Sequence, residues 1–495
     1  MTDDRSAQTL RSIAPYLADW ASFQAAYHGI PGLQLAVGRR GEVFVDLAWG
    51  KADVETGEDL TSDHLFRVAS HSKTFTGVIV MQLVERGELR LDDQVGDLVP
   101  ELDGSRAAGI TVRELLGHQG GIIRDSSDGD FWQYRRPFLD RAEVLECVRT
   151  EGIVFEPNEH FKYTNIGYSL LGIIIERVTG KTYDEAARTA VVEPLGLART
   201  GTELEPARAA EYAAGHTGRI THDDARRVVP HVDTRAMAAA TGWYSTALEM
   251  VRYGATHVLG DTTLISDASK RIMQREESRV VVRGSEVGRY GVGIGIGKIG
   301  DREVVGHSGG YPGHITRTWI DPVDGLVVSS LTNSVDGVAD LIATGVLQLI
   351  NLALGAAEEV AADEVGAGKV SGGVAAGKVT AGAAGAAGKG GDSDLVPPVP
   401  ADAPFGRFAN LWGVSDVVDL GGILHVINPR SPQPVEVTQR LVVSEGRLVQ
   451  EPVAGFGTVG EPVQVERDAD GAITSLRIGG LTSWPIEQYR AQTGR

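Results

Sequence analysis

The chain has 495 residues and a formal net charge of −19, because 66 aspartate and glutamate residues outnumber 47 lysine and arginine residues. This acidity excludes a general nucleic-acid binder, since nothing offsets the repulsion from phosphates. The single cysteine, Cys147, excludes an internal disulfide and a cysteine-based zinc cluster. We expect a cytoplasmic protein, also because the first residues are acidic and no leader-like apolar segment follows them. The longest uncharged apolar stretch, 341–354, is too short for a membrane span.

Residues 1–354 have predicted strands near both ends and predicted helices between them. Alternating apolar residues predict a hairpin formed by strands over 33–37 and 43–49. Predicted helices cover 15–27, with its proline in the first turn, and 75–85, 112–117, 142–149, 168–178, 183–192 and 341–354. Further strands are predicted over 290–299, 303–307, 315–320 and 326–332. This order is typical of one α+β domain whose sheet joins both ends of the segment.

Two segments of different composition follow. Residues 355–403 are rich in alanine and glycine, end in a proline-containing run and hold no aromatic residue, which predicts a flexible linker. Residues 404–495 carry short alternating runs separated by turn signals. That pattern predicts a small all-β domain, an antiparallel barrel, a sandwich or a lipocalin-like fold.

The first candidate motif is Ser70-His71-Ser72-Lys73, at the beginning of a predicted helix. Three residues are nearly one helical turn, so Ser70 and Lys73 would share a face. A partly desolvated lysine can lose its proton and then deprotonate a serine hydroxyl, which makes the serine a nucleophile. A helix-capping serine followed by a surface lysine is the alternative. The sequence alone suggests no role for His71 and Ser72.

The second candidate motif is Tyr163-Thr164-Asn165, just before another predicted helix. A tyrosine near a cation can carry a proton, and an asparagine side chain can orient a substrate amide. A loop tyrosine followed by a helix-capping asparagine is the alternative.

The third candidate motif is Gly-His-Ser-Gly-Gly at 306–310. Its glycines would let a backbone approach a ligand closely, or would form a simple turn between strands. The segment also matches the Gly-x-Ser-x-Gly elbow of α/β-hydrolases, with Ser308 as the nucleophile, although that elbow needs a helix where this sequence predicts a strand. Elsewhere, His216 and His222 lie near acidic residues, but a solvated loop is a simpler interpretation than a metal site.

These motifs, taken together and in order, resemble those of the serine β-lactamase and penicillin-binding-protein superfamily. The closest variety is the class C-like branch, which includes D-aminopeptidases, D-Ala-D-Ala carboxypeptidases and β-lactamase-fold esterases. The resemblance extends over roughly residues 15–350. It implies an antiparallel sheet flanked by helices, a helical subdomain and, as in some members, a small C-terminal antiparallel β-barrel.

By this resemblance, Ser70 is the acylated nucleophile, and Lys73 and Tyr163 share the acid–base work. The backbone N–H groups of Ser70 and Gly310 would form an oxyanion hole, and His118 would be a structural histidine. The residues that would bind or line the substrate site are Asn165, His307, Ser308, Gly309 and Gly310. The implied mechanism is acylation followed by hydrolysis, with no metal and no cofactor.

The third motif departs from the Lys-Thr-Gly or Lys-Ser-Gly of typical β-lactamases and D,D-peptidases. His307 is mostly neutral near pH 7, so it would attract a substrate carboxylate less strongly than a lysine does. His-x-Gly is similar to what some aminopeptidase and esterase members carry.

The sequence therefore predicts a serine hydrolase that cleaves a small ester, an amide or a D-amino-acid peptide through an acyl-serine intermediate. Its expected partner is that small-molecule substrate, without nucleic acid or membrane. One alternative is a catalytically silent binding or sensor protein with the penicillin-recognition fold. The other is an α/β-hydrolase-type esterase that uses Ser308.

Overall fold

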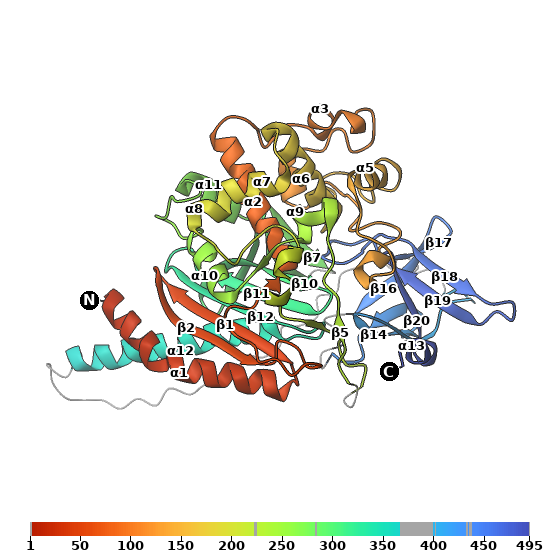
Figure 1. Cartoon of the computed structure of the whole chain (residues 1–495). Coiled ribbons are helices and arrows are strands. Elements are labelled where there is room, and N and C mark those ends of the chain that lie inside the picture. Colours follow the sequence, from red (N-terminus) through yellow and green to blue (C-terminus); the bar gives the residue numbers. More distant parts are fainter. Residues whose placement is uncertain are drawn as a thin grey trace.

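The computed structural model describes residues 2–221, 225–282, 285–366, 399–400, 402–431, 434 and 438–494. An eight-stranded antiparallel sheet lies at its centre, in the order β2-β1-β12-β11-β10-β9-β8-β7 (Figure 1). Its strands are β1 (Gly32–Arg39), β2 (Glu42–Gly50), β7 (Ser278–Val282), β8 (Ser285–Tyr290), β9 (Gly295–Ile299), β10 (Arg302–Tyr311), β11 (His314–Ile320) and β12 (Leu326–Thr332). Since β1 pairs with β12 from Leu33 opposite Thr332 to Arg39 opposite Leu326, the sheet joins the two ends of this segment, as predicted.

Helices cover both faces of the sheet. On one face α1 (Thr2–Tyr27) and α12 (Ala339–Gly366) pack against each other and against the strands. On the other face, α10 (Ala247–Ala255) packs against β1 and β12, and the remaining helices lie above it in Figure 1. These are α2 (Ser72–Glu85), α3 (Val95–Leu98), α4 (Val112–Leu116), α5 (Arg141–Thr150), α6 (Asn165–Thr179), α7 (Tyr183–Ala187), α8 (Glu193–Leu195), α9 (Ala238–Thr241) and α11 (Asp267–Gln274).

Short turns and strand pairs connect these elements. The 3₁₀ or π turns are η1 (Ala69–His71), η2 (Pro100–Leu102), η3 (Asp130–Gln133), η4 (Arg188–Val192), η5 (Pro206–Glu211) and η6 (Arg235–Met237). Two two-stranded sheets pair β3 (Phe66–Arg67) with β6 (Tyr244–Ser245) and β4 (Gly215–His216) with β5 (Val228–Val229). The first pair ties the chain just before η1 to the segment after α9.

The first helix is longer than predicted, and its proline is not in the first turn. Helix α1 begins at Thr2, so Pro15 lies in its interior, where a proline removes one backbone hydrogen bond. Side chains on both sides of Pro15, Leu10 and Leu17 among them, are fully buried in the core that α1 shares with α12 and the sheet. Burial of this apolar face keeps the helix continuous across the proline.

Other boundaries also differ from the prediction. The run 290–299 is not one strand, because β8 ends at Tyr290 and β9 begins at Gly295. Helix α12 continues past the predicted end at residue 354 to Gly366. Most of the predicted linker, 355–403, lies outside the described residues.

A second eight-stranded antiparallel sheet forms the C-terminal region, to the right of the first in Figure 1. Its strands are β13 (Gly406–Asn410), β14 (Gly413–Asp419), β15 (Leu424–Ile427), β16 (Gln439–Ser444), β17 (Arg447–Gln450), β18 (Val463–Arg467), β19 (Ile473–Ile478) and β20 (Leu481–Pro485), followed by α13 (Ile486–Thr493). An isolated bridge between Val449 and Pro462 nearly closes it into a barrel. Apolar side chains such as Phe408, Leu441 and Leu476 fill a core between its strands. The predicted α+β class with a small C-terminal antiparallel barrel is therefore confirmed.

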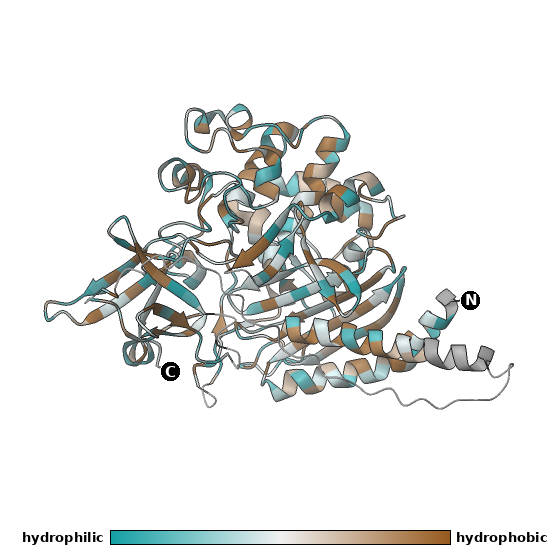
Figure 2. Ribbon diagram, turned by 180° about the vertical axis from the view of Figure 1, so that it is seen from behind, coloured by the Kyte–Doolittle hydropathy of each residue, from teal (hydrophilic) through white to brown (hydrophobic). Residues whose placement is uncertain are grey.

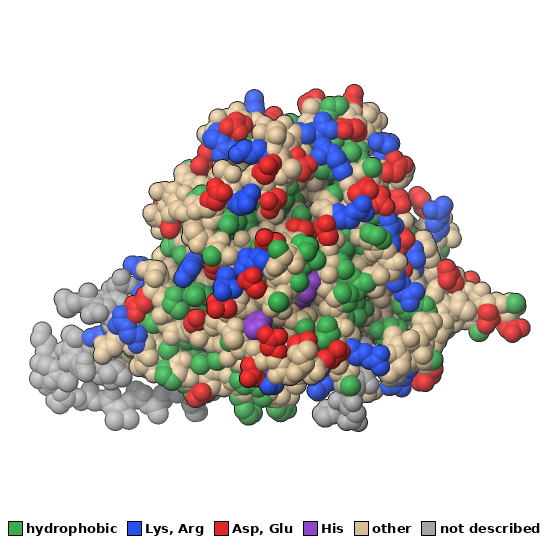
Figure 3. Space-filling view, viewed as in Figure 1, with side chains coloured by type: hydrophobic (Ala, Val, Ile, Leu, Met, Phe, Trp, Pro, Cys, Tyr) green, Lys and Arg blue, Asp and Glu red, His purple; other side chains and the backbone are tan. Residues whose placement is uncertain are grey.

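By length and composition only, residues Ala339–Ala357 of α12 are long and apolar enough to cross a membrane, whereas the shorter stretch 341–354 was predicted to be too short for a span. Ile342, Val346 and Ile350 on this helix are fully buried against α1 and the sheet. Figure 2 shows α1 and α12 side by side along this face. On the face shown in Figure 3, acidic and basic side chains are interspersed.

Candidate active site

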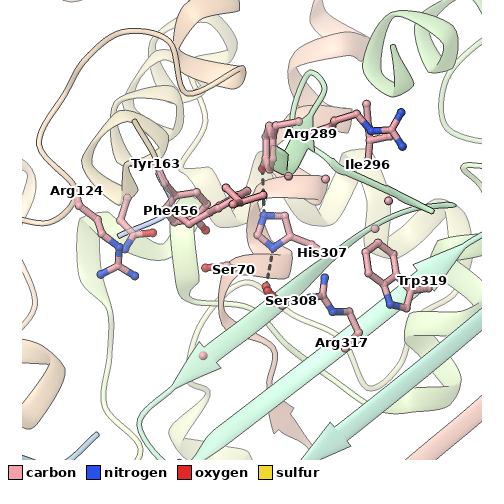
Figure 4. Close-up of a pocket in the computed structure, with 18 of the residues that line it drawn as sticks. Ser70, Arg124, Tyr163, Arg289, Ile296, His307, Ser308, Arg317, Trp319 and Phe456 are labelled. Carbon is pink, nitrogen blue, oxygen red and sulfur yellow. Dashed lines mark hydrogen bonds between the residues drawn. The ribbon is translucent and has the colours of Figure 1, made fainter. Parts of the chain in front are cut away.

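Ser70 lies in a tight turn at the beginning of α2. Ala69–His71 form the 3₁₀ turn η1, and α2 begins at Ser72. Ala69 has a φ of +49°, a conformation that costs a residue with a side chain about 1–3 kcal/mol. The turn brings Ser70 to the edge of a cavity (Figure 4), and it is held by the interactions of its neighbours.

His71 and Ser72 hold this strained turn in place. The Ser72 hydroxyl donates to the carbonyl of Ala69. The buried His71 ring places Nδ1 3.0 Å from the carbonyl oxygen of Val68 and Nε2 3.1 Å from the hydroxyl of Thr318 on β11. These two side chains therefore connect the nucleophile turn to the central sheet, which is a role that the sequence alone did not suggest.

Lys73 lies fully buried beside Ser70. Its Nζ atom is 3.3 Å from Ser70 Oγ, 2.6 Å from Asn165 Oδ1 and 2.9 Å from the carbonyl oxygen of Ala240. Burial lowers the pKa of Lys73 well below its usual value, and the Arg124 charge lowers it further. A neutral amine would donate its two hydrogens to Asn165 and Ala240, so its lone pair would face the Ser70 hydroxyl. Lys73 is therefore suited to act as a base toward Ser70.

Tyr163 lies beside Lys73 and lines the same cavity as Ser70. Its ring centre lies 4.8 Å from Lys73 Nζ. Burial raises the pKa of Tyr163 above its usual value, so the phenol keeps its proton and can donate it. The cap of α6 is Thr164, whose hydroxyl accepts from Gly167 N–H. The alternative of a capping Asn165 is wrong, and that side chain lies in the site instead.

His118 supports Tyr163 and does not reach the cavity. Its ring centre lies 4.3 Å from that of Tyr163, and its Nδ1 accepts from the backbone N–H of Thr164 at 3.1 Å. Burial lowers the pKa of His118 well below its usual value, which keeps the ring neutral. This arrangement agrees with the structural role that the resemblance implies.

Asp125 is a site residue that the sequence analysis missed. It is buried, and its Oδ1 accepts from the Asn165 side-chain amide at 2.7 Å and from Trp132 Nε1 at 2.9 Å. Its Oδ2 lies 2.7 Å from Arg124 Nη1. Asp125 thereby orients Asn165 so that the amide oxygen faces Lys73. No local pattern in the sequence connects Asp125 with Asn165.

Strand β10 brings the third motif beside Ser70. A Cβ atom at Gly309 would lie 2.1 Å from the carbonyl oxygen of Val68, so only glycine lets the strand pack this closely against the nucleophile turn. Gly310 lines the cavity together with His307 and Ser308. Ser308 sits within β10 and pairs with Arg317 on β11. Since no helix follows it, the α/β-hydrolase elbow is wrong for this chain.

His307 is held by two hydrogen bonds. Its Nδ1 lies 2.6 Å from the carbonyl oxygen of Ser308, and its Nε2 lies 3.1 Å from the Tyr290 hydroxyl (Figure 4). Burial lowers the pKa of His307 well below its usual value, and the Lys73 charge lowers it further. The neutral ring therefore donates from Nδ1 and accepts from Tyr290 at Nε2.

Arg317 supplies a positive charge beside the same strand. Its side chain lines the cavity on the Ser308 side (Figure 4) and stacks on Trp319, with the guanidinium carbon 4.4 Å from the ring centre. Its Nε lies 2.6 Å from Asp340. The sequence analysis did not single out Arg317, because its place opposite Ser308 follows from strand register.

The cavity has a volume of about 760 Å³ and is built from both parts of the chain. Ser70, Tyr163, Asn165 and the third motif contribute to it from the first part, and the barrel contributes Trp412, Phe456 and Leu481. Arg124 and Trp132 from the segment 124–137 line the cavity, whereas no described residue of 216–234 does.

His216 has a structural environment. Its Nδ1 lies 2.8 Å from the carbonyl oxygen of Asn333, and its Nε2 accepts from Val54 N–H. His222, Asp223 and Asp224 lie outside the described residues. Within the described part of the chain, no group of three or more histidine, cysteine, aspartate or glutamate residues is placed to hold a metal ion.

A family model described as Beta-lactamase matches residues 17–350. The chain belongs to the beta-lactamase family. Within this family it is 31% identical over 316 residues to penicillin-binding protein 4 of Amycolatopsis lactamdurans, which corresponds to 62% of this chain and 81% of that protein. The predicted superfamily is thus confirmed.

Solved structures extend the comparison. The D-amino acid amidase from Ochrobactrum anthropi SV3, complexed with L-phenylalanine amide, is 25% identical, with a TM-score of 0.57 over 72% of this chain and 99% of the amidase. The crystal structure of SurE matches with a TM-score of 0.58 and 23% identity, over 97% of this chain and all of SurE. The latter likeness concerns the fold alone. Our chain is therefore a β-lactamase-fold member of this family, and a D-amino acid amidase is among its structural neighbours.

Proposed function

We propose that the protein is a serine hydrolase that cleaves a small ester, an amide or a D-amino-acid peptide through an acyl-Ser70 intermediate. The observation that carries this proposal is the position of Lys73 Nζ, 3.3 Å from Ser70 Oγ in a fully buried setting that lowers the pKa of the lysine. A base needs this combination of contact and lowered pKa to activate a serine near neutral pH.

Acylation begins with proton transfer from Ser70 to the neutral Lys73 amine. Ser70 Oγ attacks the substrate carbonyl carbon, and the negative charge moves to the carbonyl oxygen. The backbone N–H groups of Ser70 and Gly310 would stabilise this oxyanion. When the tetrahedral intermediate collapses, Tyr163 donates its proton to the leaving amine or alcohol and regains a proton from Lys73. These steps leave Ser70 acylated and Lys73 neutral.

Deacylation runs through the same groups in reverse order. A water molecule takes the place of the leaving group and gives a proton to Lys73 through Tyr163 as its oxygen attacks the acyl carbon. Collapse returns the proton to Ser70 Oγ and releases the carboxylic acid. This chain's residues supply the nucleophile, the base and the proton donor.

The cavity and the relatives support a proposed substrate class. One structural neighbour is a D-amino acid amidase, and one relative is a penicillin-binding protein. His307 is neutral, so Arg317 is the cation best placed beside β10 to attract a substrate carboxylate. We therefore favour small D-amino-acid amides or peptides over neutral lipids, with a cytoplasmic location.

The test combines labelling and turnover. A fluorophosphonate should give a mass adduct on Ser70, and the wild type should hydrolyse p-nitrophenyl butyrate and D-amino acid amides. Ser70→Ala should form no adduct, and its hydrolysis rate should be lower than that of the wild type by at least about 10³-fold. A label on another residue, or equal rates in the two proteins, would overturn the proposal. Stable acylation without turnover would favour the silent sensor instead.

A further inference from the structure

A buried ion pair connects the barrel to the segment that carries Tyr163. Glu461, just before β18, has 1% of its side chain exposed, and the side chain of Lys162 is fully buried. Glu461 Oε1 accepts from Lys162 Nζ at 2.6 Å and from the backbone N–H of Arg124 at 2.9 Å. Lys162 directly precedes Tyr163, and Arg124 directly precedes Asp125. One carboxylate of the barrel thus holds the two segments that carry these site residues.

The backbone reinforces this connection. The N–H of Tyr163 donates to the carbonyl of Gly455 at 3.2 Å, and the N–H of Gly455 donates to the carbonyl of Phe161 at 3.0 Å. Phe456 follows, and its ring packs on Phe161 with the centres 4.8 Å apart. In Figure 4, Phe456 lies beside Tyr163 at the cavity. A single parallel bridge thus joins Gly455 of the barrel to Lys162, so the main chain connects residues 161–163 to the barrel as well as the ion pair does.

The segment around Tyr163 has little regular structure of its own. It lies between α5 and α6, where no helix or sheet strand is assigned from residue 151 to 164. On either side of Tyr163, the backbone N–H groups of Lys162 and Thr164 both donate to His118 of the same domain, to its carbonyl and to its ring respectively. From the barrel, Gly455 and Glu461 hold the same segment. The position of the Tyr163 phenol relative to Ser70 therefore depends on contacts with the barrel as well as with His118.

The charges of the pair depend on each other. Burial lowers the pKa of Lys162, and the Glu461 carboxylate opposes that effect. A buried ammonium that loses its counter-ion must lose its proton or move toward water, and both changes disturb the chain around it. Since Lys162 adjoins Tyr163 in sequence, any such movement would be transmitted to the phenol.

We propose that Glu461 is a positioning residue of the active site. Through Glu461, the barrel helps to hold the residues that carry out acylation. By binding Lys162, the carboxylate fixes the position of the neighbouring Tyr163 phenol. By accepting from the backbone N–H of Arg124, it fixes the loop that carries Arg124 and Asp125. This inference rests on the proposed serine hydrolase function. It goes beyond that function by assigning catalytic importance to a residue some 300 positions from Tyr163 in the sequence (461 against 163).

The test uses two esters of one acyl group. An ethyl ester needs a proton from Tyr163 when it leaves, whereas p-nitrophenolate leaves without one. Each rate is divided by the concentration of sites that form the fluorophosphonate adduct on Ser70. A smaller fraction of folded protein therefore does not change the result. Glu461→Gln should lower the ratio of the ethyl to the p-nitrophenyl rate about tenfold, as Tyr163→Phe does in the same direction.

A matched control and a double variant complete the design. Asp130→Asn also removes an interface carboxylate, one that accepts from Thr482 of the barrel, and it should leave the ratio unchanged. Tyr163→Phe combined with Glu461→Gln should lower the ratio no further than Tyr163→Phe alone, because both act through the phenol. A wild-type ratio in Glu461→Gln, or the same fall in Asp130→Asn, would overturn the positioning role.

Two outcomes remain to be separated. If Glu461→Gln does not fold, the variant that combines Lys162→Met with Glu461→Leu removes both buried charges and restores packing. A lowered ratio in that variant supports the proposal, and a wild-type ratio overturns it. If the wild type itself forms no Ser70 adduct, the proposed function has failed, whereas a labelled wild type with an unchanged Glu461→Gln ratio means that only the positioning role has failed.

Discussion

The side-chain amide of Asn165 donates to the carboxylate of Asp125 at 2.7 Å, and its oxygen accepts from Lys73 at 2.6 Å. Asp125 therefore decides which way the amide points. An amide turned the other way would present its NH₂ group to the lysine and remove the acceptor that orients the base.

Asp125→Asn should lower kcat/KM about 10–100-fold, the usual cost of losing a hydrogen bond to a charged group. It should also shift the pH profile. Asp125 raises the pKa of Lys73, so removing its charge lowers that pKa, and the acidic limb of the kcat/KM profile should move to lower pH. Asp128→Asn in the same loop is the control, because Asp128 pairs with Arg136. An acidic limb that stays in place would contradict the assignment of that limb to Lys73.

Tyr163→Phe should affect substrates according to their leaving groups. Hydrolysis of an amide or an ethyl ester should slow about 10²–10⁴-fold, the range expected for loss of a general acid, and a p-nitrophenyl ester should slow far less. Tyr168→Phe is the control: its hydroxyl donates to the carbonyl of Leu116, and its loss should change all the rates in proportion. If Tyr163→Phe slowed all the substrates equally, Tyr163 would not be the proton donor.

Arg317→Gln should discriminate between charged and neutral substrates. We expect kcat/KM for a substrate with a carboxylate next to the scissile bond to fall about tenfold or more, with a neutral ester unchanged, because an interaction with a charged partner is lost. Arg289→Gln is the control, because it also removes a cation from the cavity lining but one that lies on β8, two strands away from β10. Equal effects of both variants on charged substrates would argue for general electrostatic attraction.

Gly309→Ala should disturb the site through packing alone. The added methyl group would collide with the carbonyl of Val68, so β10 must move away from the nucleophile turn. We expect the free energy of unfolding to fall by about 1–3 kcal/mol and kcat to fall with it. Gly109→Ala, where the added Cβ meets nothing within 4 Å, should change neither. Unchanged kcat in Gly309→Ala would show that the spacing between β10 and Ser70 is not critical.

Buried histidines should make the protein sensitive to acid. Burial lowers the pKa of His71 to about 3, and of His231 and His257 to about 4, from 6.5. Below pH 6.5 the unfolded chain binds protons at these rings and the folded chain does not, so stability falls as pH decreases from 6.5 toward 4. The slope is about 1.4 kcal/mol per pH unit for each histidine.

Urea unfolding at pH 7, 6 and 5 measures this slope. His257→Leu removes one of the titrating rings, and neither ring nitrogen of His257 has a hydrogen-bond partner in the structure. The variant should therefore reduce the slope by about 1.4 kcal/mol per pH unit. An unchanged slope would mean that His257 does not contribute to it.

The local features of the site were readable in the sequence. Ser70 and Lys73 share a face because three residues make nearly one helical turn, and the hairpin of β1 and β2 follows from alternation and a turn. Gly309 stood out because a backbone that approaches another closely cannot carry a side chain. The order of the three motifs was sufficient to identify the superfamily, and with it the α+β class.

Only the tertiary structure decided what surrounds the nucleophile. Asp125 meets Asn165, Arg317 lies opposite Ser308, and Glu461 reaches Lys162 across more than half of the chain, through strand register and domain packing that no local pattern encodes. The same holds for Pro15, which lies within a helix because burial of its neighbours outweighs a lost hydrogen bond. Local geometry depends on neighbours in sequence, whereas electrostatics and packing depend on neighbours in space, and the chain brings these together only when it folds.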